Sequence, residues 1–345
     1  MAASFLNSQL VFSSSFADSK LESQNTLVIY DRILEKVSKE FRGWVRNFPA
    51  RYGVVSGEDL KDIEAFPAHL TKLANLSADF PARKMTVLAI GGGSVGDFAG
   101  FFASIYKRGV RLIHVPSTWL AAIDSSHGGK TALNFAGAKN QIGTFYPASQ
   151  VVLIRSLLAS QPRARIEDAM GELGKIALID GGAWTKKLES SKLRGEDLLW
   201  AFLKPAILSK LKVVEKDPRE ISGIRQILNL GHTVGHVIEA DLGLSHGAAV
   251  GQGLYFALDY SEERGYLKSR DADRARRLLF EVMEIQPHPR LIRSRRFVEL
   301  LAKDKKSAAA GEVTFIFLEK WGRTRRESVS VSSILNEAKR QGWAK

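Results

Sequence analysis

The chain has 345 residues, of which 45% are apolar, and it contains no cysteine. This length suits two domains of ordinary size or one large α/β domain, and the apolar share is sufficient for a sizeable core. No apolar run is long enough to span a membrane, so a membrane-spanning helix is excluded, and the N-terminal segment lacks the order of a secretory signal. The expected location is therefore the cytoplasm.

The missing cysteine and the positive charge narrow the chemistry further. Disulfides, thiolate metal sites and cysteine nucleophiles are excluded, so any metal ion must be bound by His, Asp or Glu. The formal net charge is +13, from 50 Lys and Arg against 37 Asp and Glu. The basic runs have little aromatic interleaving and no nucleic-acid motif, so we expect no nucleic-acid partner. A solvated basic surface that attracts a phosphorylated substrate fits this balance.

The first half of the chain alternates strand-like and helical segments. Strands are predicted at residues 26–30, 51–56, 85–90, 110–115 and 151–154. Helices are predicted at 32–41 and 98–106, and a further helix follows residues 57–61 and reaches about residue 76. Nothing is assigned to residues 1–25. This alternation predicts an α/β domain with a parallel sheet that ends near Pro162. We therefore expect one domain at residues 1–160 and a second at 161–345.

A glycine-rich turn, Gly91-Gly-Gly-Ser-Val-Gly-Asp97, connects the predicted strand at 85–90 to the following helix. Glycines at such a turn let backbone N–H groups approach a pyrophosphate, which a helix N-terminus favours electrostatically. The pattern differs from Gly-x-Gly-x-x-Gly, so a tight turn that needs positive φ is an alternative. Asp97 suits a polar cofactor contact or, equally, a charge at the helix N-terminus.

A long polar segment follows the strand at 110–115. It contains Asp124-Ser-Ser-His-Gly-Gly-Lys130 and then Asn134 and Lys139-Asn140. A loop of this length without a function is uncommon, so we predict that it takes part in binding. Lys130 and Lys139 each suit a phosphate or a cofactor.

The second half is predicted to be mainly helical. Helices are expected at residues 167–178, 183–190, 196–215, 225–240, 247–264, 271–284 and 295–303, then a hairpin of strands 313–318 and 327–331, and a last helix at 332–341. In the helix at 225–240, the spacing of His232 and His236 places both imidazoles on one face, and His246 returns from the next loop. A metal site and a set of ordinary helix and loop histidines are both open, and a carboxylate elsewhere would favour the metal.

Several blocks occur in a fixed order along the chain: Gly91-Gly-Gly-Ser-Val-Gly-Asp97, Tyr106-Lys-Arg-Gly109, Val115-Pro-Ser-Thr118, Asp124-Ser-Ser-His-Gly-Gly-Lys-Thr131, Lys139-Asn-Gln-Ile-Gly-Thr-Phe-Tyr146, Leu228-Asn-Leu-Gly-His-Thr-Val-Gly-His236, His246-Gly247 and Asp304-Lys-Lys306. Together they resemble the 3-dehydroquinate synthase family of sugar-phosphate cyclases over about residues 31–322. The resemblance implies an N-terminal α/β nucleotide-binding domain and a mainly α-helical C-terminal domain, with the active site in the cleft between them. It also implies a homodimer without a membrane or nucleic-acid partner.

The resemblance implies which residues bind the metal, the cofactor and the substrate. Zinc, or alternatively Co²⁺, would be held by Glu172, His232 and His246, which leaves His236 for substrate chemistry. NAD would be contacted by residues around the glycine turn: Asp31, Glu58, Lys61, Gly91, Gly92, Gly93, Asp97, Ser117, Thr118 and Lys139. A phosphorylated heptulosonate would be held by Arg108, Asp124, Lys130, Asn140, Lys175, Lys210, Glu220, Arg225, Asn229, His236 and Lys305, with Lys306 as an alternative to the last.

The implied reaction converts 3-deoxy-D-arabino-heptulosonate 7-phosphate into 3-dehydroquinate and phosphate, a step of the shikimate pathway. It proceeds by NAD-dependent transient oxidation, phosphate elimination, reduction and aldol closure, so NAD is recycled. The block Gln161-Pro-Arg-Ala-Arg165, the Ala248 position and an apparent insertion at Ile221 depart from the family pattern. The alternatives are a cyclase that uses sedoheptulose 7-phosphate, a metal-dependent alcohol or glycerol dehydrogenase, and a catalytically silent paralogue.

Overall fold

A computed structural model of the chain describes residues 8–303 and 311–345. It divides into two compact units, Met1–Pro162 and Arg163–Lys345. Within the described residues, no helix is both long enough and apolar enough to cross a membrane.

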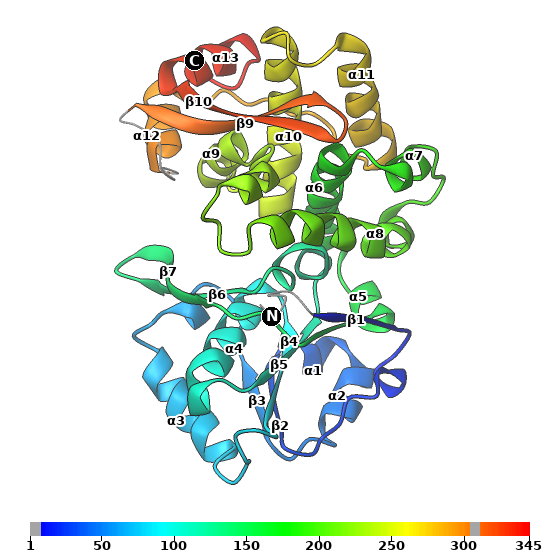
Figure 1. Ribbon diagram of the computed structural model, residues 1–345, viewed down its shortest axis with the longest axis vertical. Helices are drawn as coiled ribbons and strands as arrows, with labels where there is room; N and C mark the ends of the chain where they lie inside the picture. The colour runs from blue at the N-terminus through cyan, green and yellow to red at the C-terminus, as the bar shows by residue number, and fades with distance from the viewer. Residues whose placement is uncertain (1–7, 304–310) are drawn as a thin grey trace. The chain divides into compact units, whose positions relative to one another are not determined.

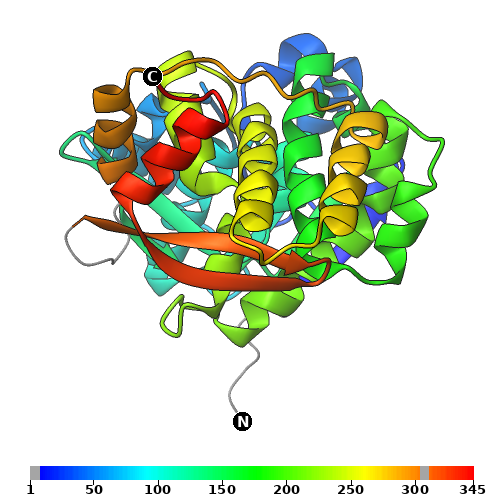
Figure 2. The same ribbon diagram turned by 90° about the horizontal axis from the view of Figure 1, so that it is seen from above.

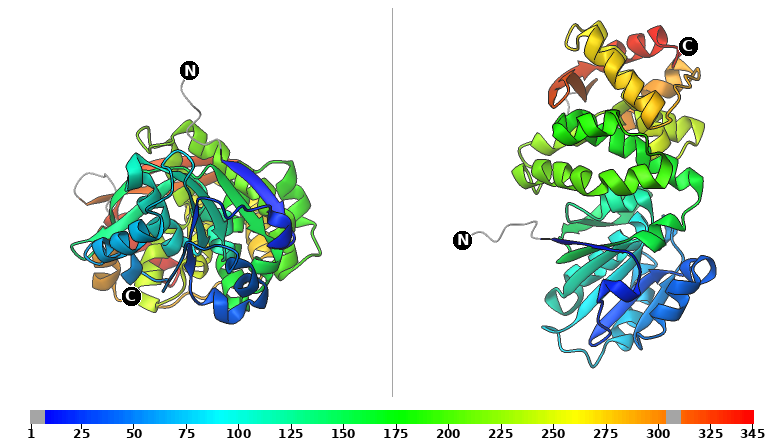
Figure 3. Two further views of the ribbon diagram at one scale, coloured as in Figure 1. Left: turned by 90° about the horizontal axis from the view of Figure 1, so that it is seen from below. Right: turned by 90° about the vertical axis from the view of Figure 1, so that its right-hand side faces the viewer.

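The first unit is built on a parallel six-stranded sheet in the order β1-β8-β5-β4-β2-β3. Its strands are β1 (Gln9–Ser13), β2 (Thr26–Asp31), β3 (Arg51–Val54), β4 (Thr86–Gly91), β5 (Arg111–Pro116) and β8 (Gln150–Ile154). The sequence missed β1, which pairs with β8 at the edge of the sheet (Figure 3). This strand is short and only partly buried, and it therefore lacks the continuous apolar run that reveals β2 and β4.

Helices cover both faces of this sheet. The helices of the first unit are α1 (Leu34–Val37), α2 (Lys39–Val45), α3 (Phe66–Leu76), α4 (Gly93–Ile105) and α5 (Arg155–Ala159). Val28, Leu88 and Ile113 project from one face into a core shared with Phe41 of α2. On the opposite face, Leu112 approaches α4, and Figure 1 shows α4 and α2 on different sides of the strands. Burial on both faces explains the near-continuous apolar runs of these strands.

The polar segment after β5 is more ordered than the sequence indicates. It contains a short π-helical turn, η4 (Ala121–Ser125), and an antiparallel hairpin of β6 (Lys130–Phe135) and β7 (Ala138–Phe145). Most of β7 is exposed, so its polar residues give no hydrophobic signal for a strand. Short 3-10 turns, η1 (Ala17–Ser19), η2 (Asp59–Lys61) and η3 (Tyr106–Arg108), complete the unit.

The second unit is mainly helical, with α10 at its centre. Its helices are α6 (Arg163–Asp180), α7 (Ala183–Glu189), α8 (Gly195–Lys216), α9 (His232–Leu242), α10 (His246–Glu263), α11 (Ser269–Arg277), α12 (Ser294–Lys303) and α13 (Val331–Arg340), with short turns η5 (Ile224–Asn229) and η6 (Leu278–Val282). The hairpin of β9 (Glu312–Lys320) and β10 (Arg323–Ser330) runs beside α10, as the orange ribbon in Figure 2 shows.

Two helices predicted as continuous are interrupted. The predicted helix at 225–240 divides into η5 and α9, because Gly231 adopts a left-handed conformation with φ of +80°. The predicted helix at 271–284 divides into α11 and the π-helical turn η6. Apolar periodicity cannot distinguish these breaks from a regular helix, since the buried positions continue through them.

Glycines bring α10 unusually close to α6. A Cβ built on Gly247 would lie 1.6 Å from the carbonyl oxygen of Asp168, and one built on Gly171 would lie 2.1 Å from the carbonyl oxygen of Gly247. Only residues without a side chain permit such an approach of two backbones. Gly171 precedes Glu172 and Gly247 follows His246, so the contact brings the ends of those two side chains toward each other.

Candidate functional site

In the first unit, the strand order reverses between β2 and β4. From β2 the chain continues to the neighbouring β3, then crosses to β4, β5 and β8 on the other side. Ligands of open α/β sheets bind at the carboxyl ends of the strands at such a reversal. Asp31 ends β2 and Gly91 ends β4, so both lie at this edge.

The glycine turn leads directly into α4. Gly92 caps the helix without a side-chain hydrogen bond, and a Cβ on Gly92 would lie 3.4 Å from the Thr118 side chain. Thr118 accepts a hydrogen bond from the Ala121 backbone, and the backbone N–H of the buried Ser117 donates to the Gly91 carbonyl. The predicted phosphate turn and the two hydroxyl residues after β5 therefore lie together.

A buried lysine connects three segments of the same unit. Lys61 of η2 lies 2.6 Å from Asp97 of α4 and also hydrogen-bonds the Asn140 side chain. Burial raises the pKa of Asp97, and the ammonium of Lys61 opposes that shift. Asn140 reaches this place from a left-handed conformation with φ of +56°. Two predicted cofactor residues and a predicted substrate residue thus form one polar cluster.

Glu58 and Lys139 lie at the exposed rim of this region. The Glu58 carboxylate accepts a hydrogen bond of 2.8 Å from the Asn134 side chain, and Nζ of Lys139 lies 4.0 Å from Oε1 of Glu58. Asn134 also accepts a hydrogen bond from the Asn140 backbone, so it holds the hairpin against η2. Of the remaining predicted residues of this unit, Arg108 follows α4 with φ of +68°, Asp124 lies in η4, and Lys130 is exposed at the start of β6.

In the second unit, three predicted ligands converge from three helices. The Nε2 atoms of His232 and His246 lie 3.4 Å and 3.7 Å from the same Glu172 oxygen, Oε1. Glu172 comes from α6, His232 begins α9, and His246 begins α10. The sequence analysis placed His246 in a loop. In the structure it is instead the first residue of α10. The ligand atoms all lie within 4.8 Å of one another, a spacing that suits one metal ion.

The surroundings of this cluster fit a divalent cation. Glu172 is fully buried, and its second oxygen forms an ion pair of 2.5 Å with the buried Lys175. Burial, followed by the charge of Lys175, lowers the pKa of His232 well below its usual value, which keeps this imidazole in the neutral form that binds metals. Burial also opposes protonation of His246, but the carboxylates of Glu172 and Glu239 outweigh it and raise the pKa to about 10. A cation bound beside Glu172 would displace that proton.

His236 lies beside the cluster but is grouped differently. Its ring is 5.3 Å from that of His232 and 5.8 Å from that of His246, measured between centroids. Its ligand atoms group with those of Glu239 and His246, whereas Glu172 groups with His232 and His246. This arrangement agrees with the choice of His246 over His236 as a ligand, and the assignment stays a prediction.

The remaining predicted substrate residues that the structure describes in this unit lie in η5, shortly before it, or on α8. Arg225 is buried, its guanidinium donates to the Pro218 carbonyl, and it lies 3.8 Å from Glu220. Asn229 ends η5 and Lys210 is buried on α8. Lys305 and Lys306 lie outside the described residues.

Sequence reasoning assigned no individual role to three residues that build these sites. Asp217 accepts hydrogen bonds from the backbones of Ile221, Ser222 and Arg225, which shapes the loop before η5. Asn134 and Glu239 contact predicted site residues. Two of them carried a signal: Asn134 stands in the polar segment that was predicted to take part in binding, and Glu239 follows His236 at helical spacing.

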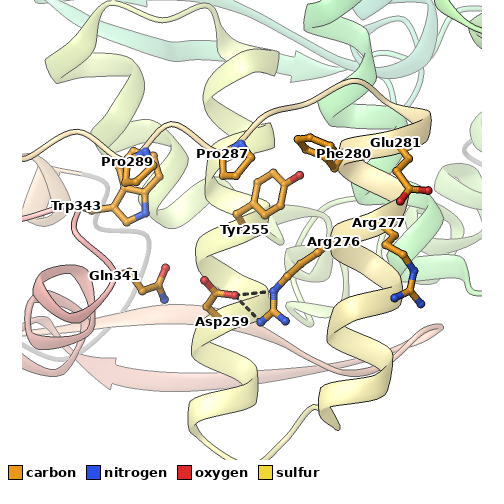
Figure 4. A pocket seen from close by; sticks show the side chains of 10 residues that line it. All are labelled: Tyr255, Asp259, Arg276, Arg277, Phe280, Glu281, Pro287, Pro289, Gln341 and Trp343. Carbon is orange, nitrogen blue, oxygen red and sulfur yellow. Dashed lines mark hydrogen bonds and ion pairs between the residues drawn. The ribbon is translucent and has the colours of Figure 1, made fainter.

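The described residues of the second unit line at least two cavities. One of about 190 Å³ is lined by Lys210 together with Asp180 and Lys216. The other, of about 390 Å³, is bordered by aromatic side chains including Tyr255 and Trp343 (Figure 4). Among the residues that line the larger cavity, none belongs to the predicted site, so it carries no part of the expected chemistry.

The fold is that of the sugar-phosphate cyclases. The crystal structure of 2-deoxy-scyllo-inosose synthase complexed with carbaglucose-6-phosphate, NAD⁺ and Co²⁺ superimposes with a TM-score of 0.81 at 23% identity, covering 96% of each chain. Family models described as 3-dehydroquinate synthase N-terminal and C-terminal match residues 51–168 and 169–307. The chain belongs to the 3-dehydroquinate synthase family.

Two curated relatives support this assignment. The 3-dehydroquinate synthase of Nitrosococcus oceani is 40% identical over 232 residues, which are 65% of this chain and 64% of the relative. That of Nitrosospira multiformis is 38% identical over 264 residues, 74% of this chain and 71% of the relative. The match thus spans just under two thirds of the first relative and somewhat more of the second.

Proposed function

We propose that the chain is an active 3-dehydroquinate synthase that converts 3-deoxy-D-arabino-heptulosonate 7-phosphate into 3-dehydroquinate and phosphate. The observation that carries this proposal is the convergence of Glu172, His232 and His246 on one point, in a chain that matches both family models. We further propose that NAD binds at the glycine turn and that Zn²⁺ or Co²⁺ binds at the three-residue cluster.

When bound, these two groups would supply reversible hydride transfer and polarisation of a hydroxyl or carbonyl oxygen. Glu172 and two neutral imidazoles leave coordination positions for substrate oxygens, as a catalytic site requires. The ammonium of Lys175 pairs with the Glu172 carboxylate, so this buried acidic group has a cation beside it. Glu172 is fully buried while the His246 side chain is about one third exposed, so the metal would bind between the protein interior and solvent.

The cations of the second unit suit an anionic substrate. Lys210 and Arg225 are both buried, and a guanidinium or ammonium in such a place binds phosphate or carboxylate strongly. We assign proton exchange with a substrate oxygen to His236, whose ring centroid lies 5.3 Å from that of His232. These roles, the homodimer, the cytoplasmic location and the position of the site between the two domains stay predictions.

Phosphate release tests the proposal. The purified chain with NAD and Zn²⁺ is expected to release phosphate from the seven-carbon deoxy substrate without net formation of NADH, because the transient oxidation is reversed within each turnover. Net accumulation of NADH at 340 nm would instead identify a dehydrogenase. A chain that binds zinc and NAD but neither releases phosphate nor forms NADH would be a silent paralogue.

A further inference from the structure

His246 is held at both edges of its ring. Its Nε2 faces Oε1 of Glu172 at 3.7 Å, and its Nδ1 lies 3.0 Å from Oε2 of Glu239. His232 follows the same scheme, since its Nδ1 lies 3.3 Å from the carbonyl oxygen of Leu230 while Nε2 faces Glu172. In each case a protein oxygen faces Nδ1, and Nε2 points to the shared carboxylate.

Glu239 reaches His246 from the neighbouring helix. It lies about two helical turns after His232 on α9, so the two residues share one face of that helix. One face of α9 therefore presents a proposed ligand and a carboxylate directed at the proposed ligand of α10. Glu239 and His246 are each about one third exposed, so this contact is open to solvent while Glu172 is not.

The same atoms allow a second interpretation, in which Glu239 itself binds a cation with His236 and His246. The geometry of the ring argues against it. The carboxylate of Glu239 faces Nδ1, at the edge of the imidazole away from the Nε2 that faces Glu172. While its carboxylate makes this contact, Glu239 therefore does not coordinate an ion that is bound between Glu172 and Nε2.

We propose that Glu239 is a positioning residue for the metal ligand His246. Its carboxylate accepts the Nδ1–H hydrogen bond, which selects the tautomer with a free electron pair on Nε2, fixes the ring plane and makes Nε2 more basic. This inference rests on the proposed function only in that a divalent ion binds at Glu172. Loss of such a partner typically weakens metal binding by about 10- to 100-fold.

The test measures metal affinity directly, using the full chain. Glu239→Ala, Glu239→Gln and Asp241→Ala are compared by zinc competition with a chromogenic chelator and by the electronic absorption spectrum of the Co²⁺ form. Asp241 is the matched control because it removes a carboxylate from the same helix, and its contact is Arg296 of α12 at 3.4 Å. Circular dichroism establishes that each variant is folded.

We expect Glu239→Ala to weaken zinc binding by about 10- to 100-fold and to change the Co²⁺ spectrum. Glu239→Gln should lose less, because its amide oxygen still accepts the hydrogen bond without the charge, and Asp241→Ala should match the wild type. If Glu239→Ala fails to fold, the Glu239→Gln comparison decides. The proposal is overturned if both Glu239 variants bind zinc as tightly as the wild type, or if the wild type binds two ions per chain. A wild-type chain that binds no metal would instead refute the proposed function.

Discussion

Replacing Gly247 by alanine should separate the two helices that carry Glu172 and His246. The new Cβ would lie 1.6 Å from the carbonyl oxygen of Asp168 and 2.3 Å from its carbonyl carbon, both backbone atoms of α6. Ordinary contacts between such atoms are about 3.5 Å, so α10 must move by on the order of 2 Å at this point. Overpacking of this kind costs about 1–3 kcal/mol, and we expect the upper end because no flexible side chain can yield.

The same movement should abolish metal binding. His246 precedes the substituted residue, and metal–ligand distances tolerate deviations of only about 0.2 Å. Denaturant unfolding and zinc content after dialysis measure the two effects. Gly43→Ala in α2 is the control, because nothing lies within 4 Å of its added Cβ, and it should gain about 0.5–1 kcal/mol and keep its zinc. Unchanged stability and full zinc content in Gly247→Ala would refute the account of helix packing given above.

Three further predictions concern the metal, the cofactor and pH. Glu172→Gln and His232→Ala should each lose zinc on dialysis, which metal analysis measures; retention by both would remove these residues from the ligand set. Lys61→Ala deprives the Asp97 carboxylate of its cation and should weaken NAD binding about 10- to 100-fold by equilibrium dialysis, whereas unchanged affinity would place NAD elsewhere. Burial lowers the pKa of His114 to about 4, so the unfolded chain binds the proton more tightly and stability is lost as pH falls from about 6.5 toward 4. By pH 5 this amounts to about 2 kcal/mol in denaturant unfolding, and His114→Gln should reduce that loss.

The sequence predicts the elements that are defined by continuous apolar runs. β2 and β4 are buried on both faces, so every residue contributes to the signal, and the helices α6 and α10 carry long apolar faces. The glycine turn at Gly91 was also evident, because a chain that passes from a buried strand into a helix needs such a turn. These features are local, and the sequence therefore carries them without knowledge of the tertiary structure.

What the sequence could not predict depends on contacts between distant residues. Nothing near Glu239 in sequence indicates that its carboxylate meets the ring of His246, because the chain reverses between α9 and α10. The approach of Gly247 to the backbone of Asp168 joins residues far apart in the chain, and the block His246-Gly247 does not by itself indicate that approach. The ligand set followed from the family resemblance, since helical spacing alone favoured the pair His232 and His236.

The substrate preference tests the central claim most directly. Phosphate release is measured with the purified chain, NAD and Zn²⁺ on two substrates in parallel, 3-deoxy-D-arabino-heptulosonate 7-phosphate and sedoheptulose 7-phosphate. The account predicts rapid release from the deoxy acid, formation of 3-dehydroquinate in equal amount, and little release from the other sugar. Release from sedoheptulose 7-phosphate but not from the deoxy acid would contradict it.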